Sequence, residues 1–80
     1  MPMKIRLDTL SDATEFANIA TQIGGYVILT DRSTGLRVNG KSILGVLHAM
    51  EFSDIWVESD DEIYGKIRKF VIEDWGSYES

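Results

Sequence analysis

The stretch GLRVNGKSILGVL, residues 35–47, is compatible with two structures that imply different functions. Its beginning satisfies G-x-x-x-x-G-K-[ST], the pattern of a phosphate-binding P-loop, which would make Gly35–Ser42 a nucleotide site. The same residues can instead form a short strand, Leu36–Asn39, followed by a helix that begins at Ser42 and runs to about Met50. In that second structure Ser42 is the helix N-cap and there is no nucleotide site.

The residues in the middle of this stretch favour the strand. Leu36, Arg37 and Val38 are bulky, whereas a phosphate-cradling loop uses small residues that let the backbone approach its ligand closely. The preceding Asp31–Gly35 is typical of a turn between antiparallel neighbours, while a P-loop lies in a parallel sheet whose strands need long crossovers. We therefore expect a strand, a turn and a helix, and the P-loop-like nucleotide binder is the less favoured alternative.

Hydrophobic patterns outside this stretch predict the other elements. Alternation predicts a strand at residues 3–7, and β-branched and aromatic residues predict strands at residues 26–30 and 55–58. A first helix is expected to follow an N-cap at Ser11 and to end at Gly24, and a last helix to run from a Ser59–Glu62 capping box to Asp74. The order β-α-β-β-α-β-α predicts an α+β open-faced β-sandwich, in which three helices cover one face of a four-stranded antiparallel sheet.

Size and composition limit the classes of function. Eighty residues form one small domain, residues 1–80, and a net charge of −5 with a pI near 4.6 opposes nucleic-acid binding. The chain has no cysteine and a single histidine, which excludes cysteine-based and multi-histidine metal sites, and we expect no cofactor. The sequence shows no signal peptide or membrane span, so the expected location is the cytoplasm, without membrane contact.

Residues 38–46 resemble a known protein family. Their sequence VNGKSILGV matches V-N-x-K-S-I-x-G-V, and it resembles the segment around the regulatory serine of HPr, the histidine-containing phosphocarrier of the bacterial sugar phosphotransferase system. The helix that begins near Ala13 and Thr14 and leads into a strand is also similar to the family. The resemblance extends from about Lys4 to Glu73. It implies the family's open-faced β-sandwich, in which the second and fourth strands are neighbours.

The family's catalytic motif is missing from this chain. In phosphocarriers a G-x-H-x-R-P motif precedes the first helix and its histidine accepts the phosphoryl group, but residues 7–12 read LDTLSD, with Thr9 at the histidine position. Asp8, Asp12 and Glu15 surround this helix start and would repel the phosphate that a helix N-terminus attracts. The resemblance is therefore to a divergent member that has lost histidine phosphotransfer. We expect no catalytic residue and no enzyme activity.

The resemblance implies two roles for the start of the second helix. The matching serine of the family is phosphorylated by a dedicated kinase in some bacteria, which makes Ser42 a candidate for regulatory phosphorylation, and a plain N-cap is the alternative. The family also docks its protein partners here, so a transcription regulator, a kinase or a sugar-system component is the expected partner. The candidate partner-binding residues are Ile43, Leu44, Leu47 and His48. The alternative role of Leu44 and Leu47 is packing in the core, for which Ile43 and Val46 are the favoured residues of this helix.

A second candidate surface lies on the sheet. Strand alternation places Tyr26, Ile28 and Trp56 on the face that the helices do not cover. There they would either pair across strands to stabilise an open sheet, or bind a partner or a second copy of the chain. The sequence leaves both roles open. We expect a monomer or a weak dimer.

Overall fold

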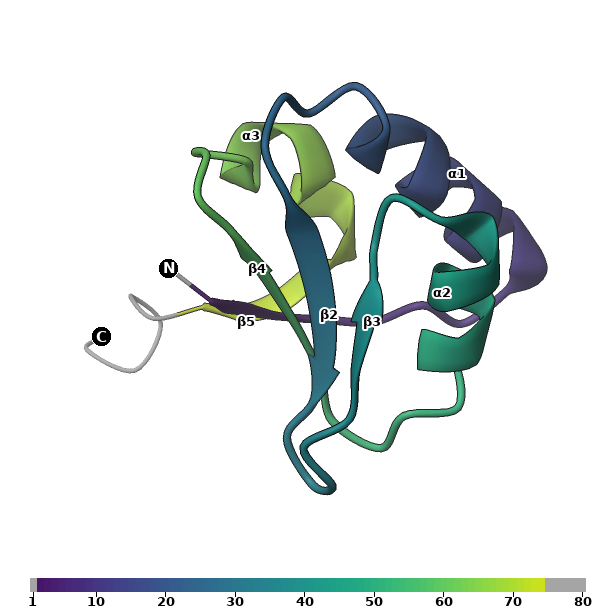
Figure 1. The fold of residues 1–80 in the computed structure, drawn as a ribbon. Coiled ribbons are helices and arrows are strands. Elements are labelled where there is room, and N and C mark those ends of the chain that lie inside the picture. The colour runs from purple at the N-terminus through teal and green to yellow at the C-terminus, as the bar shows by residue number, and fades with distance from the viewer. Residues whose placement is uncertain (1, 75–80) are drawn as a thin grey trace.

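The computed structural model describes residues 2–74, which form a five-stranded antiparallel sheet with three α-helices packed against it (Figure 1). In chain order the elements are β1 (Met3–Ile5), α1 (Leu10–Ala20), β2 (Val27–Asp31), β3 (Arg37–Asn39), α2 (Ile43–Ala49), β4 (Ile55–Ser59), α3 (Tyr64–Ile67), a 3-10 helix (Arg68–Phe70) and β5 (Val71–Asp74). The predicted α+β class and antiparallel sheet are confirmed, with one strand more than expected.

The strands lie in the order β3-β2-β4-β1-β5, so β3 and β5 form the two edges of the sheet. β2 pairs antiparallel with β4, with Leu29 opposite Val57, which confirms that the second and fourth strands are neighbours. Along β2 the buried Val27 and Leu29 alternate with the partly buried Ile28 and Thr30. This alternation gives the sheet a core face and an open face.

The core lies between the sheet and the helices. Phe16 of α1 is fully buried and meets Phe70 edge to face, with 5.5 Å between the ring centroids. Val46 and Ala49 of α2 are fully buried in the same cluster. Each of these two helices therefore buries one face against the sheet and leaves the other face exposed.

The last part of the described chain differs from the prediction. The predicted helix from Ser59 to Asp74 is wrong, because only Tyr64–Ile67 is α-helical and Val71–Asp74 is a strand that pairs with β1. Ser59 is the last residue of β4. The side chain of Glu62 accepts from the Tyr64 backbone N–H at 2.9 Å, so the expected Ser59–Glu62 capping box does not form.

The hydrophobic spacing of this segment fits a helix and the observed structure equally well. Ile63, Ile67 and Phe70 are all buried, since one α-helical turn followed by a 3-10 turn also places them on one side. Val71 and Ile72 are β-branched, and they extend the sheet along β1, which would otherwise be an open edge. The sequence also predicts a frayed end at residues 77–80, which lie outside the described residues.

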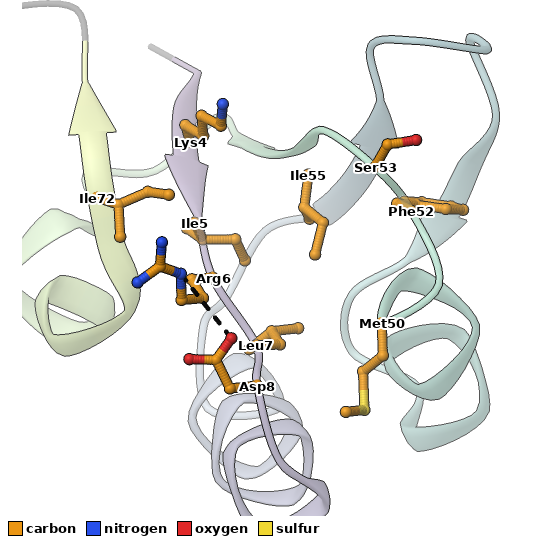
Figure 2. A pocket seen from close by; sticks show the side chains of 10 residues that line it. All are labelled: Lys4, Ile5, Arg6, Leu7, Asp8, Met50, Phe52, Ser53, Ile55 and Ile72. Atoms are coloured by element: carbon orange, nitrogen blue, oxygen red, sulfur yellow. Dashed lines mark ion pairs between the residues drawn. The ribbon is translucent and has the colours of Figure 1, made fainter.

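A cavity opens where β1 and β4 separate, after only two paired positions. Beyond this point the backbone N–H of Arg6 donates to the Phe70 carbonyl at 2.9 Å, which holds the chain on the side of β5. The loop that leads into β4 is held on the opposite side, because the Arg32 N–H donates to the Asp54 carbonyl at 3.0 Å. The two segments enclose a cavity of about 330 Å³ (Figure 2).

Candidate functional site

Helix α2 begins at Ser42, as the sequence predicts. Ser42 has extended backbone angles, and its hydroxyl oxygen accepts from the Gly45 N–H at 3.3 Å. Its carbonyl accepts from the Val46 N–H at 2.9 Å, the first intrahelical bond. The hydroxyl of Ser42 thus caps the helix while its side chain remains only partly buried.

Gly45 is required for the position of this helix. A Cβ atom on Gly45 would collide with the carbonyl oxygen of Asn39, the last residue of β3. Only the absence of a side chain therefore lets the first turn of α2 lie directly against the end of β3. This close approach determines which side of α2 faces the core.

The exposed side of α2 carries apolar residues next to Ser42. Leu44 is 75% exposed and Ile43 is 42% exposed, whereas Leu47 is partly buried and packs against the core. His48 is exposed at the end of the helix. Helical spacing of three and four residues joins these four side chains into one continuous surface, so the structure brings together all the predicted partner-binding residues.

The expectation that Ile43 belongs to the core is wrong. The buried residues of α2 are Val46 and Ala49, on the side where Gly45 meets β3. Ile43 lies about a quarter-turn away from the centre of this buried side, on the flank of the helix. Val46 is fully buried, as expected.

The most exposed residues of α1 and α2 are uncharged. Helix α1 packs against α2 on the same side of the sheet (Figure 1). We call the exposed residues of these helices the outer helix surface; they are Leu10, Ser11, Thr14, Asn18, Ile43, Leu44 and His48. None is an aspartate, glutamate, lysine or arginine, although these make up 26% of the chain. Solvent-facing sides of surface helices normally carry such residues, and their depletion is typical of the centre of a protein interface.

Both charged side chains of these two helices are engaged by other groups. Asp12 accepts from the backbone N–H groups of Asp8 and Thr9, at 3.0 and 3.3 Å. Glu15 forms an ion pair with Lys69, with carboxylate oxygens at 2.9 and 2.8 Å from the ammonium nitrogen. Neither carboxylate therefore adds an unpaired charge to the outer helix surface.

Thr9, at the position of the family's phosphohistidine, is the N-cap of α1. Its hydroxyl oxygen accepts from the Asp12 N–H at 3.0 Å, and the Asp12 carboxylate accepts from Thr9 N–H, so the two residues form a capping box. The N-cap predicted at Ser11 is therefore wrong, since Ser11 lies inside the first turn. The carboxylate of Asp12 occupies amides that a bound phosphate would use.

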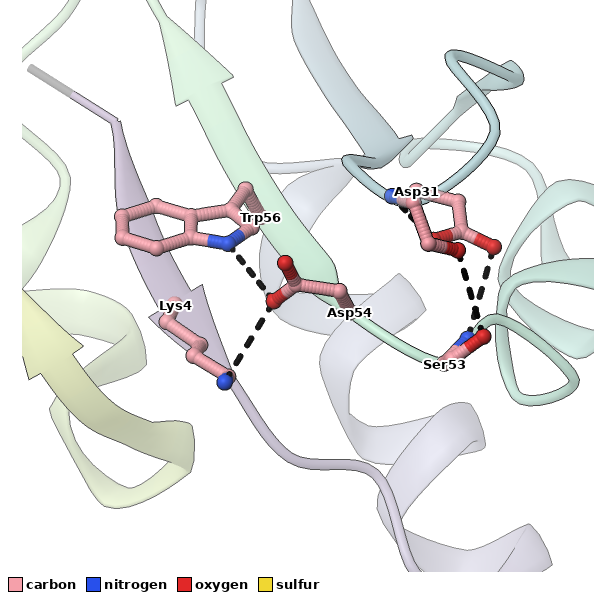
Figure 3. A network of polar contacts seen from close by, with 6 residues as sticks. Lys4, Asp31, Ser53, Asp54 and Trp56 are labelled. Atoms are coloured by element: carbon pink, nitrogen blue, oxygen red, sulfur yellow. Dashed lines mark hydrogen bonds and ion pairs between the residues drawn. The ribbon is translucent and has the colours of Figure 1, made fainter.

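The predicted surface around Trp56 is closed. Trp56 lies on the open face of the sheet but is only 4% exposed, because the Arg32 guanidinium covers its ring at 3.7 Å from the centroid. Its indole N–H donates to Asp54 at 2.8 Å, and Lys4 lies 3.4 Å from the same carboxylate oxygen (Figure 3). The expected exposure of Trp56 is therefore wrong.

The other two residues of this predicted surface do not form an apolar patch with Trp56. Tyr26 is exposed but lies before the first residue of β2. Ile28 is partly buried and pairs with Glu58, while Trp56 pairs with Thr30 and not with Ile28. Charged and polar neighbours thus separate the three side chains.

Asp31, which the sequence predicts only as part of a turn, is a buried acid. Its side chain is 3% exposed, and its carboxylate accepts from the Ser33 hydroxyl at 2.6 Å and from the N–H groups of Ser33 and Ser53 at 3.0 and 3.4 Å. The Ser33 hydroxyl contributes most to lowering the pKa of Asp31, against the opposing effect of burial. Asp31 thereby joins the β2–β3 hairpin to the loop before β4 (Figure 3). An aspartate two residues before a serine is the local signal for such a turn.

The segment Gly35–Ser42 does not have the geometry of a P-loop. Its middle is strand β3, and the Gly40 N–H donates to the carbonyl of Val27 at 2.7 Å. The ammonium of Lys41 donates to the carbonyls of Ile23 and Gly25, at 2.6 and 2.9 Å. The lysine that would hold nucleotide phosphates is thus committed to the backbone after α1.

Within residues 2–74, no group of three or more histidine, aspartate or glutamate side chains is arranged to hold a metal ion. None of the helices in this described part is long and apolar enough to cross a membrane. Comparisons with protein-family models, with curated protein sequences and with solved structures found no match to this chain.

Proposed function

We propose that this chain is a protein-interaction domain that binds a partner protein through the outer helix surface, centred on Leu44. The observation that carries the proposal is the 75% exposure of Leu44 beside the 42% exposure of Ile43, on two helices whose most exposed residues are uncharged and whose Glu15 is paired with Lys69. A single exposed leucine is ordinary in a monomeric protein. Two adjacent apolar side chains in an uncharged surrounding match the composition of an interface centre.

The chemistry of the surface indicates the class of partner. Nucleic acids and anionic membranes are recognised by clustered cations, and the outer helix surface contains no lysine or arginine. The hydroxyl and amide side chains of Ser11, Thr14 and Asn18 donate and accept hydrogen bonds without requiring an opposite charge. The complementary partner is therefore a protein surface with an apolar centre for Leu44 and an uncharged polar margin.

We also propose that the domain is an HPr-like protein that has lost histidine phosphotransfer and acts in bacterial carbon regulation. Its partner would then be a transcription regulator, a kinase or a sugar-system component. The neighbouring β2 and β4, the helix start at Ser42 and the close approach of Gly45 to Asn39 support this proposal. The capping box at Thr9 supports the loss of phosphotransfer.

Phosphorylation of Ser42 would regulate binding at this surface. The Ser42 hydroxyl is next in sequence to Ile43 and makes one long hydrogen bond, 3.3 Å, to the Gly45 N–H. A phosphate would add roughly −1.5 to −2 charges beside an uncharged surface. We therefore expect phosphorylation to weaken binding of a partner that presents an apolar, uncharged contact.

The interaction is tested with a photo-crosslinking residue placed at position 44 and, as a matched control, at position 36. Leu36 is also an exposed leucine, 53% exposed, but it lies before β3 and outside the outer helix surface. We expect one protein to be captured from position 44 and not from position 36. With that protein purified, Leu44→Asp should weaken binding by about tenfold or more, and Leu36→Asp should leave it unchanged. Equal effects at the two positions would overturn the proposal.

Two assays test the proposed family. Incubation with phosphoenolpyruvate and the general enzyme of the phosphotransferase system should add no phosphate, since the chain lacks the histidine. Incubation with the family's serine kinase and ATP should add one phosphate, read by intact mass, that is absent in Ser42→Ala. Labelling in the first assay would contradict the loss of phosphotransfer. Failure of the second would leave Ser42 as a helix cap without affecting the docking proposal.

A further inference from the structure

The dipeptide Asn39–Gly40 ends β3 and begins the turn that leads into α2, and it is the single Asn-Gly pair of the sequence. Asparagine loses its side-chain amide most readily before glycine, because glycine has no side chain that hinders attack by its own backbone nitrogen. In this reaction the Gly40 nitrogen gives up its proton and bonds to the side-chain carbonyl carbon of Asn39, and ammonia leaves. Water then opens the cyclic imide, which produces aspartate or isoaspartate at position 39.

The fold requires a glycine at position 40. Gly40 is buried, and a Cβ atom on it would lie 2.8 Å from the Val27 side chain and 3.1 Å from the Val27 carbonyl oxygen. Val27 is a fully buried residue of β2, so it has little freedom to move away. A larger residue at position 40 would therefore push the end of β3 off β2, and the reactive glycine is fixed by packing.

The side chain and the carbonyl of Asn39 shape the turn into α2. The side-chain oxygen accepts from the Lys41 N–H at 2.9 Å, and the backbone carbonyl accepts from the Ser42 N–H at 3.3 Å. The same carbonyl is the group against which Gly45 packs. An aspartate carboxylate can accept the bond from Lys41 in the same way. Isoaspartate cannot preserve this turn, because its backbone runs through the former side chain and is one atom longer.

The folded chain holds the two reacting groups in place. The Gly40 N–H donates to the Val27 carbonyl at 2.7 Å, so the nitrogen keeps its proton and is directed toward β2. The side-chain oxygen of Asn39 is held by the Lys41 N–H. Attack on Asn39 requires that the bond to Val27 breaks and that the Gly40 nitrogen turns away from β2. Asn39 itself is exposed, so water reaches it without any such movement.

We infer that Asn39 is a site of spontaneous deamidation that the folded chain protects, and that the reaction proceeds only when the junction between β3 and α2 opens. Its rate is then the rate of an unfolded peptide multiplied by the fraction of molecules in which the junction is open. The isoaspartate product lengthens the backbone at the carbonyl on which Gly45 packs, and it therefore loosens α2 from β3. This inference does not depend on the proposed function.

The test is incubation of the full chain at mildly alkaline pH, followed by the loss of the Asn39 side-chain amide signal in NMR spectra. Asn18, the other asparagine, lies within α1 and is the internal control. A synthetic peptide of residues 35–44 gives the unprotected rate. We expect Asn39 of the folded chain to react at least about tenfold more slowly than the peptide, and the two rates to converge in urea that unfolds the chain. Equal rates in the folded chain and the peptide would overturn the inference.

Two glycine substitutions test whether opening of this junction controls the rate. Gly45→Ala should raise the rate at Asn39 by about fivefold or more, because its Cβ collides with the Asn39 carbonyl oxygen and favours the open junction. Gly65→Ala lies in α3, where a Cβ meets no atom within 4 Å, and it should leave the rate unchanged. A folded Gly45→Ala chain that reacts at the unmodified rate would overturn the inference. The comparison with the peptide decides the question if Gly45→Ala does not fold.

The two products test the consequence for the fold. Asn39→Asp reproduces the aspartate product and keeps the acceptor for the Lys41 N–H, so its unfolding temperature should stay close to that of the unmodified chain. The isoaspartate form, separated by ion exchange, should unfold at a lower temperature than Asn39→Asp. Equal unfolding temperatures for these two forms, which carry the same charge, would contradict the loosening of α2 from β3.

Discussion

The guanidinium carbon of Arg32 lies 3.7 Å from the centre of the Trp56 ring. Trp56 belongs to the open face of the sheet, opposite the three helices, yet it is one of the buried residues. Arg32 follows directly after β2, while Trp56 lies in β4, so pairing of these two strands brings them together. The open face is thus covered at this point by a charged side chain of the same chain rather than by a helix.

The stacking of Arg32 on Trp56 predicts a measurable change on truncation. In a Trp75→Phe background, Arg32→Ala should shift the emission of Trp56 to longer wavelength and increase its quenching by acrylamide, because the ring becomes accessible to water. The free energy of unfolding should fall by about 0.5–2 kcal/mol. Arg68→Ala, which removes an exposed arginine far along the chain, should change neither quantity. Unchanged emission in Arg32→Ala would show that another group covers the ring.

The buried carboxylate of Asp31 predicts a pH-dependent contribution to stability. Hydrogen bonds, chiefly from the Ser33 hydroxyl, hold its pKa in the folded state below the ordinary value of 3.8. The unfolded chain therefore binds the proton more readily than the folded chain. The contribution of Asp31 is fully present above about pH 3.8 and is lost as the pH falls toward the lower pKa of the folded state.

Urea unfolding of the unmodified chain and of Asp31→Asn measures this contribution. Asp31→Asn should be less stable at pH 7, and the difference between the two should shrink as the pH is lowered below 3.8. The comparison cancels the effect of the other acidic residues, which both proteins share. A difference that stays constant down to the acid unfolding transition would contradict the lowered pKa.

The contact of Gly45 with β3 predicts opposite effects for two glycine substitutions. Gly45→Ala should destabilise the fold by about 1–3 kcal/mol, because its Cβ would collide with the Asn39 carbonyl oxygen. Gly65 lies in α3, where a Cβ would meet no atom within 4 Å. Gly65→Ala should stabilise the fold by about 0.5–1 kcal/mol through helix propensity. Thermal unfolding of both variants tests the pair, and equal effects would contradict the close approach.

The hydroxyl of Thr30 predicts a stabilising substitution. Within the described residues its oxygen is buried and has no hydrogen-bond partner, on the open face between Trp56 and Arg37. Thr30→Val keeps the shape and removes the unsatisfied group, so the free energy of unfolding should rise by about 1 kcal/mol. Thr30→Ser keeps the hydroxyl and loses a methyl group, and it should be destabilising. A destabilised Thr30→Val would show that the hydroxyl has a partner.

The start of α1 predicts unequal effects at two neighbouring hydroxyl residues. Thr9→Ala should destabilise by about 1 kcal/mol, because it removes the oxygen that accepts from the Asp12 N–H. Ser11 is exposed in the first turn and does not cap the helix, so Ser11→Ala should be neutral or slightly stabilising. Chemical unfolding distinguishes the two variants. The reverse ranking would restore Ser11 as the cap.

Local chemistry in the sequence determined the middle of the fold. Residues 26–39 alternate and turn like two antiparallel strands, and Ser42 followed by apolar residues at helical spacing begins α2 where predicted. These features depend on neighbours within a few residues, which a sequence displays directly. The scarcity of charge along α1 and α2, which carry only Asp12 and Glu15, is also visible in the sequence. That their exposed residues form one surface follows only from the packing of the two helices.

Tertiary structure alone decided that the described chain ends in a strand, that Trp56 is buried and that a cavity opens beside β1. The spacing of Ile63, Ile67 and Phe70 satisfies a continuous helix and the observed turn alike, and pairing with β1 selects the strand Val71–Asp74. Alternation along β4 places Trp56 on the open face of the sheet. Its burial cannot be deduced from this alternation, because it results from Arg32, the residue after β2, stacking on the Trp56 ring. Each outcome depends on partners far apart in the sequence, because strand pairing and side-chain stacking are decided by which elements meet in space.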